Sequence, residues 1–194
     1  HLMEFAGVKN LTISGCSFSN QTITQEKLYY EAIQIDILVK VHINGYVYEP
    51  LANSNVTITN CSFTDVPRGI GSHTAIHNRP VDGVTITNCT FTNCKSAAIQ
   101  GLNWNNVYVA GNTITNCSRG IAMYSVKEEG AGAYPGSYWG SGSGLSDAYV
   151  ASTSTNKNIT IENNTITTSG TDPYGEYKKG AIVVEGLEIG RAHV

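Results

Sequence analysis

Two short segments of the chain carry an acid and an imidazole at matching positions. Aligned on a central isoleucine, Glu31-Ala-Ile-Gln-Ile-Asp36 and Arg68-Gly-Ile-Gly-Ser-His73 place Asp36 level with His73. If the two segments are neighbouring parallel strands, these residues lie about 4.8 Å apart. A carboxylate at that distance favours the charged form of a histidine and orients its ring. Asp36 and His73 are therefore candidate catalytic residues, and the alternative is an exposed ion pair worth about 0–1 kcal/mol.

Arginine recurs in one column of the same alignment, at Arg68 and Arg119. Two guanidinium groups could bind the carboxylates of a uronate polymer bidentately, and His73 could then act as the base of a polysaccharide lyase. The alternative is that both arginines are turn residues, paired with Glu31. Arg68 is the third catalytic candidate.

Glycoside hydrolysis is the other chemistry to consider, and it needs two carboxyl groups about 5–5.5 Å or about 6.5–9.5 Å apart. Glu4 and Asp36 are one coil and two residues apart, roughly 8 Å on the diagonal. Asp36 and Glu185 are four coils apart, roughly 19 Å, and cannot act as a pair. The alternative for Glu4 is a hydrogen bond to Gln34 in the next coil. No metal site and no cofactor are predicted, because a calcium site needs several converging carboxylates.

Sugar binding usually combines aromatic rings, which pack on the apolar faces of sugars, with a few polar groups that set orientation. Residues of both kinds lie near the catalytic candidates or in two long insertions. The predicted substrate-binding residues are Glu4, Glu31, Gln34, Gln100, Trp104, Arg119, Tyr138 and Trp139.

The elements that must position these residues form a fivefold repeat. The segment Gly83 to Cys94 reads Gly-Val-Thr-Ile-Thr-Asn-Cys-Thr-Phe-Thr-Asn-Cys, so apolar and hydroxyl side chains alternate on both sides of an asparagine. This alternation predicts two short strands around an Asn corner. The same pattern occurs at 10–20, 55–65, 106–116 and 158–168. The closest repeats are 23 residues apart, which is typical of one turn of a β-solenoid.

Stacking the repeats predicts columns of equivalent residues. The inward columns are Ile13, Ile58, Ile86, Val109 and Ile161; Cys16, Cys61, Cys89, Asn112 and Asn164; and Phe18, Phe63, Phe91, Ile114 and Ile166. The cysteines are expected to act as small buried hydrophobes. The corner column needs left-handed backbone and holds Asn60, Asn88 and Asn163, with Gly15 and Gly111. A third strand in each coil faces the core with Ile33, Ile70, Ile99, Ile121 and Ile182.

The predicted coil has three strands, an Asn corner and third-strand segments that include Ala98-Ile-Gln-Gly-Leu-Asn-Trp104. In these features the chain resembles the pectin-lyase-like superfamily. From about residue 2 to 186 it resembles β-helix repeat domains of large bacterial secreted or surface proteins. The resemblance implies an all-β, right-handed parallel β-helix of about six coils, and an extracellular or cell-surface location. Polygalacturonase-type motifs are absent, and 71–73 matches the Gly-His-Gly motif only loosely. That family's catalytic aspartates are therefore not carried over.

One domain, 1–187, is expected, with insertions at 38–54 and 125–157. Residues 188–194 read like a translated sequencing adapter, so we expect a non-native tail and a chain truncated at both ends that continues into further coils.

The net charge is −3, with 14% charged residues and no basic run, so nucleic acid is not an expected partner. The sequence contains no stretch of 18 apolar residues, so no membrane-spanning helix is predicted. Five cysteines without a Cys-x-x-Cys pair indicate neither a disulfide framework nor a zinc site.

Two functions remain as hypotheses, both with a polysaccharide as partner. The first is an extracellular polysaccharide lyase or glycoside hydrolase that uses Asp36, Arg68 and His73. The second is a non-catalytic surface module for glycan binding or adhesion. A plain spacer would leave the aromatic insertions unexplained. Because solenoids need capped ends for solubility, the chain alone is expected to aggregate or associate end to end.

Overall fold

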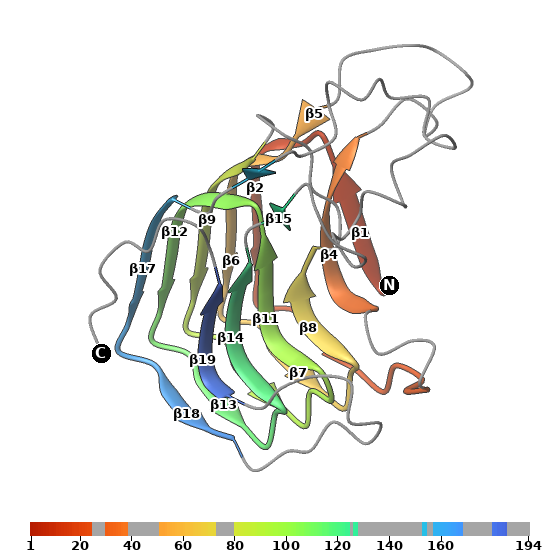
Figure 1. Ribbon diagram of the computed structural model, residues 1–194. Coiled ribbons are helices and arrows are strands. Elements are labelled where there is room, and N and C mark those ends of the chain that lie inside the picture. Colours follow the sequence, from red (N-terminus) through yellow and green to blue (C-terminus); the bar gives the residue numbers. More distant parts are fainter. Residues whose placement is uncertain are drawn as a thin grey trace.

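The structure is a computed structural model that describes residues 1–24, 30–38, 51–72, 80–124, 126–127, 153–154, 157–168 and 180–185. In these ranges the chain forms parallel strands that stack coil upon coil, so that strands of successive repeats lie side by side (Figure 1). Three parallel sheets result, one from each strand position of the coil. The predicted all-β solenoid with three strands per coil is confirmed.

The three sheets, which we call A, B and C, each collect the strands of one position in the coil. Sheet A contains the third strands, in the order β1 (Met3–Ala6), β4 (Glu31–Leu38), β8 (Arg68–Gly71), β11 (Ala97–Leu102), β14 (Arg119–Tyr124) and β19 (Gly180–Glu185). Sheet B contains β2 (Lys9–Ser14), β6 (Ser54–Thr59), β9 (Val81–Thr87), β12 (Trp104–Ala110) and β17 (Lys157–Glu162). Sheet C contains β3 (Ser17–Ser19), β7 (Ser62–Thr64), β10 (Thr90–Thr92), β13 (Thr113–Thr115) and β18 (Thr165–Thr167). The six strands of sheet A match the predicted coil number.

The register between strands confirms the predicted inward columns. In sheet B, Ile58 pairs with both Ile13 and Ile86, and Val109 with Ile86 and Ile161. Sheet C aligns Phe18, Phe63, Phe91, Ile114 and Ile166 in the same way. Most of these side chains are at most 9% exposed, because each coil buries its apolar face against its neighbours.

The corners are confirmed by the backbone. Asn60, Asn88 and Asn163 each have a φ of 53°, and Gly15 and Gly111 have 67° and 66°. This left-handed region is open to glycine and is reached by asparagine more readily than by other residues. Side-chain hydrogen bonds between coils run through further asparagines of positive φ: Asn55 to Asn10, Asn93 to Asp65, Asn116 to Asn93 and Asn158 to Asn106. Such ladders tie neighbouring coils together at their turns.

Short antiparallel ladders lie within both predicted insertions. After β4, strand β5 (Leu51–Ala52) folds back so that Ala52 pairs with Ile37. After β14, strands β15 (Val126–Lys127) and β16 (Thr153–Ser154) pair with each other. Both insertions thus follow the carboxyl end of a sheet A strand. The predicted tail, 188–194, lies outside the described residues.

Four of the five cysteines are buried as expected, Cys16 is partly exposed, and all five thiols are free. Cys61, Cys89, Cys94 and Cys117 are 0–3% exposed. Burial raises the pKa of Cys89 to about 11, which leaves the thiol protonated and unreactive at neutral pH. These residues act as small core side chains.

Candidate functional site

A local feature of sheet A turns charged side chains outward at the start of its strands. In β4, β8, β11 and β14 two consecutive residues face the core, first alanine or glycine and then isoleucine. A side chain on Gly69 would meet the core ring of Phe91 at 2.6 Å, and Ile70 is itself in the core. The residue before the small one therefore faces outward. The strands of sheet A present Glu31, Arg68 and Arg119 at this position.

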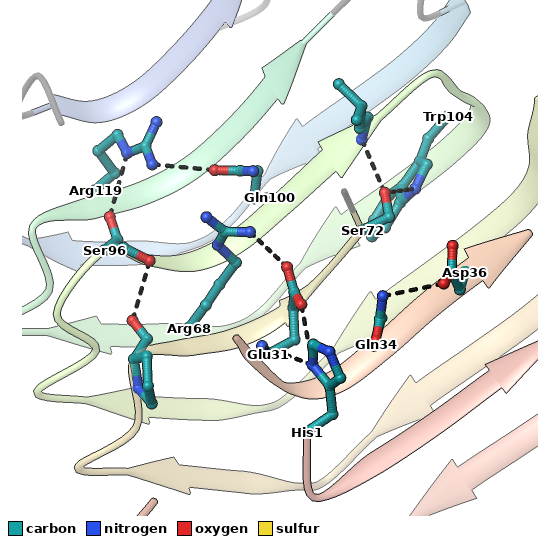
Figure 2. Close-up of polar contacts among 12 residues, drawn as sticks. His1, Glu31, Gln34, Asp36, Arg68, Ser72, Ser96, Gln100, Trp104 and Arg119 are labelled. Carbon is teal, nitrogen blue, oxygen red and sulfur yellow. Dashed lines mark hydrogen bonds and ion pairs between the residues drawn. The ribbon is translucent and has the colours of Figure 1, made fainter. Parts of the chain in front are cut away.

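Glu31 and Arg68 form a buried ion pair on this face (Figure 2). Arg68 Nη1 donates to Glu31 Oε1 at 2.5 Å, and the two side chains are 1% and 0% exposed. Gly71 makes the arrangement possible, because a Cβ there would lie 2.9 Å from Arg68 Cδ and 3.2 Å from Glu31 Cγ. The predicted pairing with Glu31 is confirmed for Arg68, but the prediction that Arg68 and Arg119 are turn residues is wrong, because they begin strands β8 (Arg68–Gly71) and β14 (Arg119–Tyr124).

His1 completes this cluster from the neighbouring coil. Its Nδ1 lies 3.2 Å from the other carboxylate oxygen of Glu31. Burial is the largest influence on the ring and lowers its pKa, but the hydrogen bond and charge of Glu31, with a smaller contribution from Glu4, outweigh it. The pKa of His1 is therefore raised above 6.5.

Arg119 is held in a separate cluster two coils away. Its Nη2 donates to Gln100 Oε1 at 3.0 Å, its Nε donates to the Ser96 carbonyl at 3.2 Å, and its Nη1 donates to the hydroxyl of Tyr124. The guanidinium carbon also lies 5.5 Å from the centre of the Tyr124 ring. With a side chain only 3% exposed, Arg119 supports the sheet and orients Tyr124.

Asp36 is fixed by its own strand. Its carboxylate accepts hydrogen bonds from the Gln34 amide at 3.1 Å and from the backbone N–H of Ile37 at 2.8 Å, and the residue is 6% exposed. Ala6 is its partner in β1. His73, its predicted partner on the other side, lies outside the described residues, so the Asp36 and His73 pair stays a prediction.

Asn53, which was not among the residues predicted from the sequence, lies just before β6 and hydrogen-bonds to residues of β1 and β4 and to Val8. It is fully buried. Its Oδ1 accepts from Val8 N at 2.8 Å, and its Nδ2 donates to the carbonyls of Asp36 at 2.6 Å and Phe5 at 3.3 Å. An asparagine inside a predicted insertion carried no distinguishing signal in a chain so rich in asparagine.

Glu4 is exposed, and its Cα pairs with that of Gln34. Both the predicted diagonal to Asp36 and the predicted hydrogen bond to Gln34 assume this register, so both stay predictions. The prediction that Trp104 offers an exposed ring is wrong. Trp104 is 0% exposed, and its Nε1 donates to Ser72 Oγ at 3.0 Å (Figure 2). The reason is the turn at Asn103, where a φ of 55° ends the sheet A strand and makes Trp104 the first residue of β12. Tyr138 and Trp139 lie outside the described residues.

Neither a metal site nor a membrane helix is found in the ranges that the structure describes. No three His, Cys, Asp or Glu side chains there are grouped to hold a metal ion. No helix in the same ranges is long and apolar enough to cross a membrane.

The architecture and the polar outer face of sheet A define a parallel β-helix protein. A model of the family described as "Right handed beta helix region" matches residues 2–131, and the chain belongs to this family. This agrees with the predicted right-handed coil and is consistent with the pectin-lyase-like superfamily. Neither the curated proteins nor the solved structures contained a match.

Proposed function

We propose that this protein binds a polysaccharide outside the cell or on the cell surface, with the outer face of sheet A as a non-catalytic binding face. One observation carries the choice of binding over catalysis: Glu31, Asp36, Arg68 and Arg119 are only 0–6% exposed and are held by neighbouring groups. A general acid or base must reach the bond that it cleaves. Charged groups buried in this way serve better as a rigid frame.

Tyr124 is the group that we expect to touch the sugar. It ends β14, its ring is only half-buried, and Arg119 fixes its hydroxyl. A ring with one polar edge and one apolar face suits the face of a sugar. The predicted insertion that follows Tyr124 in the sequence contains Tyr134, Tyr138, Trp139 and Tyr149.

A panel of neutral and acidic polysaccharides, read by affinity electrophoresis with the whole chain, tests the proposal. Tyr124→Ala should weaken binding by about fivefold or more, because an aromatic contact is worth about 1 kcal/mol. Tyr108→Ala is the matched control, since Tyr108 is 39% exposed on sheet B. Equal loss in both variants, or no binding to any polymer, would refute the proposal.

A polysaccharide lyase or glycoside hydrolase is the second candidate. The preset orientation of Asp36 by Gln34 and by the backbone of Ile37 favours it, because catalytic groups are held in place by supporting hydrogen bonds. The same panel should be read for new reducing ends and for unsaturated uronate absorbance. Turnover that disappears in Asp36→Asn and His73→Ala would establish the enzyme, whereas binding without turnover that survives both substitutions would exclude it.

A further inference from the structure

The outer face of sheet C has one chemistry throughout. Each three-residue strand turns its middle side chain inward and its two flanking side chains outward. All ten outward positions hold a hydroxyl residue, and seven of the ten are exposed while three are half-buried. They are Ser17, Ser19, Ser62, Thr64, Thr90, Thr92, Thr113, Thr115, Thr165 and Thr167.

These residues form a two-dimensional array. Parallel strands that pair in register place equivalent side chains about 4.8 Å apart along the stack, and two residues along one strand are about 6.6 Å apart. The five strands thus give two files of five hydroxyl groups, with no shift of register between neighbouring strands. Both repeats are fixed by the backbone.

The array is backed by a regular core and linked by a hydrogen bond on its surface. Behind this face the rings of Phe18 and Phe63 are 6° from parallel, as are those of Phe63 and Phe91, so the core side chains keep the same orientation from coil to coil. Threonine has a restricted χ1 angle, so its hydroxyl and methyl groups keep their positions. Ser62 Oγ donates to Ser17 Oγ at 2.9 Å, which links two coils on the face itself.

The composition of the face restricts what it can bind. It has no charged group to attract an acidic polymer and no ring to stack on a sugar, although both are the usual means of binding such ligands. It offers instead regularly spaced hydroxyl groups beside methyl groups. That pattern fits a ligand whose own hydrogen-bonding groups repeat in two dimensions at the same distances.

Ice is a ligand of this kind. Waters that hydrogen-bond tetrahedrally at an O···O distance of about 2.75 Å have second neighbours about 4.5 Å apart, and the repeat along the hexagonal axis is about 7.3 Å. The two repeats of the face, about 4.8 and about 6.6 Å, lie within about a tenth of these values. We propose that the outer face of sheet C binds the surface of ice crystals, with its methyl groups and hydroxyl groups in contact with ordered water. This face is separate from sheet A, so the two proposals can fail independently.

Ice-crystal shaping and thermal hysteresis, measured on the whole chain, test the proposal directly. The wild-type protein should shape growing crystals and delay their growth. Thr90→Lys and Thr113→Lys each place a long charged side chain on an exposed central position of the array and should abolish both effects. Thr160→Lys, at an exposed position on sheet B, is the matched control and should leave both intact. Circular dichroism and a urea midpoint for each variant establish that it is folded.

The proposal is overturned if the folded wild-type protein neither shapes ice nor shows hysteresis. It is also overturned if the two sheet C variants act like wild type, or if the sheet B control loses activity equally. Binding to microcrystalline cellulose that the sheet C substitutions abolish, without any effect on ice, would assign the face to a crystalline polysaccharide and would refute the ice proposal.

Discussion

Replacement of Arg68 by methionine should destabilise the β-helix strongly. Arg68 Nη1 lies 2.5 Å from Glu31 Oε1, and neither side chain is more than 1% exposed. Arg68→Met therefore removes the guanidinium from a buried carboxylate that His1 also contacts. Removing one partner of a buried ion pair costs about 3–5 kcal/mol. At a urea m-value of about 2 kcal/mol/M, the denaturation midpoint should fall by roughly 1.5–2.5 M.

The double variant Glu31→Met/Arg68→Met separates loss of the pair from loss of packing. Replacing both members of a buried pair with apolar residues is often close to neutral, so the double variant should be much more stable than the sum of the single variants predicts. Urea denaturation followed by circular dichroism measures the wild type, the two single variants and the double variant. A midpoint shift below about 0.5 M for Arg68→Met, or additive single effects, would refute the interpretation of a desolvated pair.

Two further predictions concern the same face. The pKa of His1 is raised above 6.5 in the folded chain, so its contribution to stability should be complete below about pH 6.5 and lost as pH rises through the raised value. The difference in urea midpoint between wild type and His1→Gln should shrink over that window, and a difference independent of pH would contradict the Glu31 contact. Asn53→Ala leaves the Val8 N–H and the Asp36 carbonyl without this buried partner, and should cost about 2–4 kcal/mol. A loss below about 0.5 kcal/mol, which is usual for surface positions, would show that these groups do not depend on Asn53.

The core and its register were predictable from the sequence because both depend on local periodicity. Side chains alternate with period two along a strand, and each coil repeats the same short pattern. Aligning the repeats was therefore enough to predict that Ile58 pairs with Ile86 and that Phe63 pairs with Phe91. The positive φ at Asn88 was also predictable, because few residues tolerate that backbone conformation.

The sheet A site was only partly predictable, and Trp104 shows the reason. Its place depends on whether the chain turns at Asn103 or continues the preceding strand, and an asparagine permits either. The structure turns there, and the ring lies in the core. Asn53 was missed because its partners, Val8 and Asp36, come from distant parts of the sequence.

The sequence by itself determined the fold class, the stacking of the coils and the residues that could lie together on the outer face of sheet A. Only the tertiary structure decided what those residues do, because burial and hydrogen bonding depend on contacts between coils. Glu31 and Arg68 illustrate this: the alignment placed them in one column, and their complete burial makes them a structural pair. The hydroxyl array of sheet C became significant in the same way, once the register between strands showed that its two files are regular.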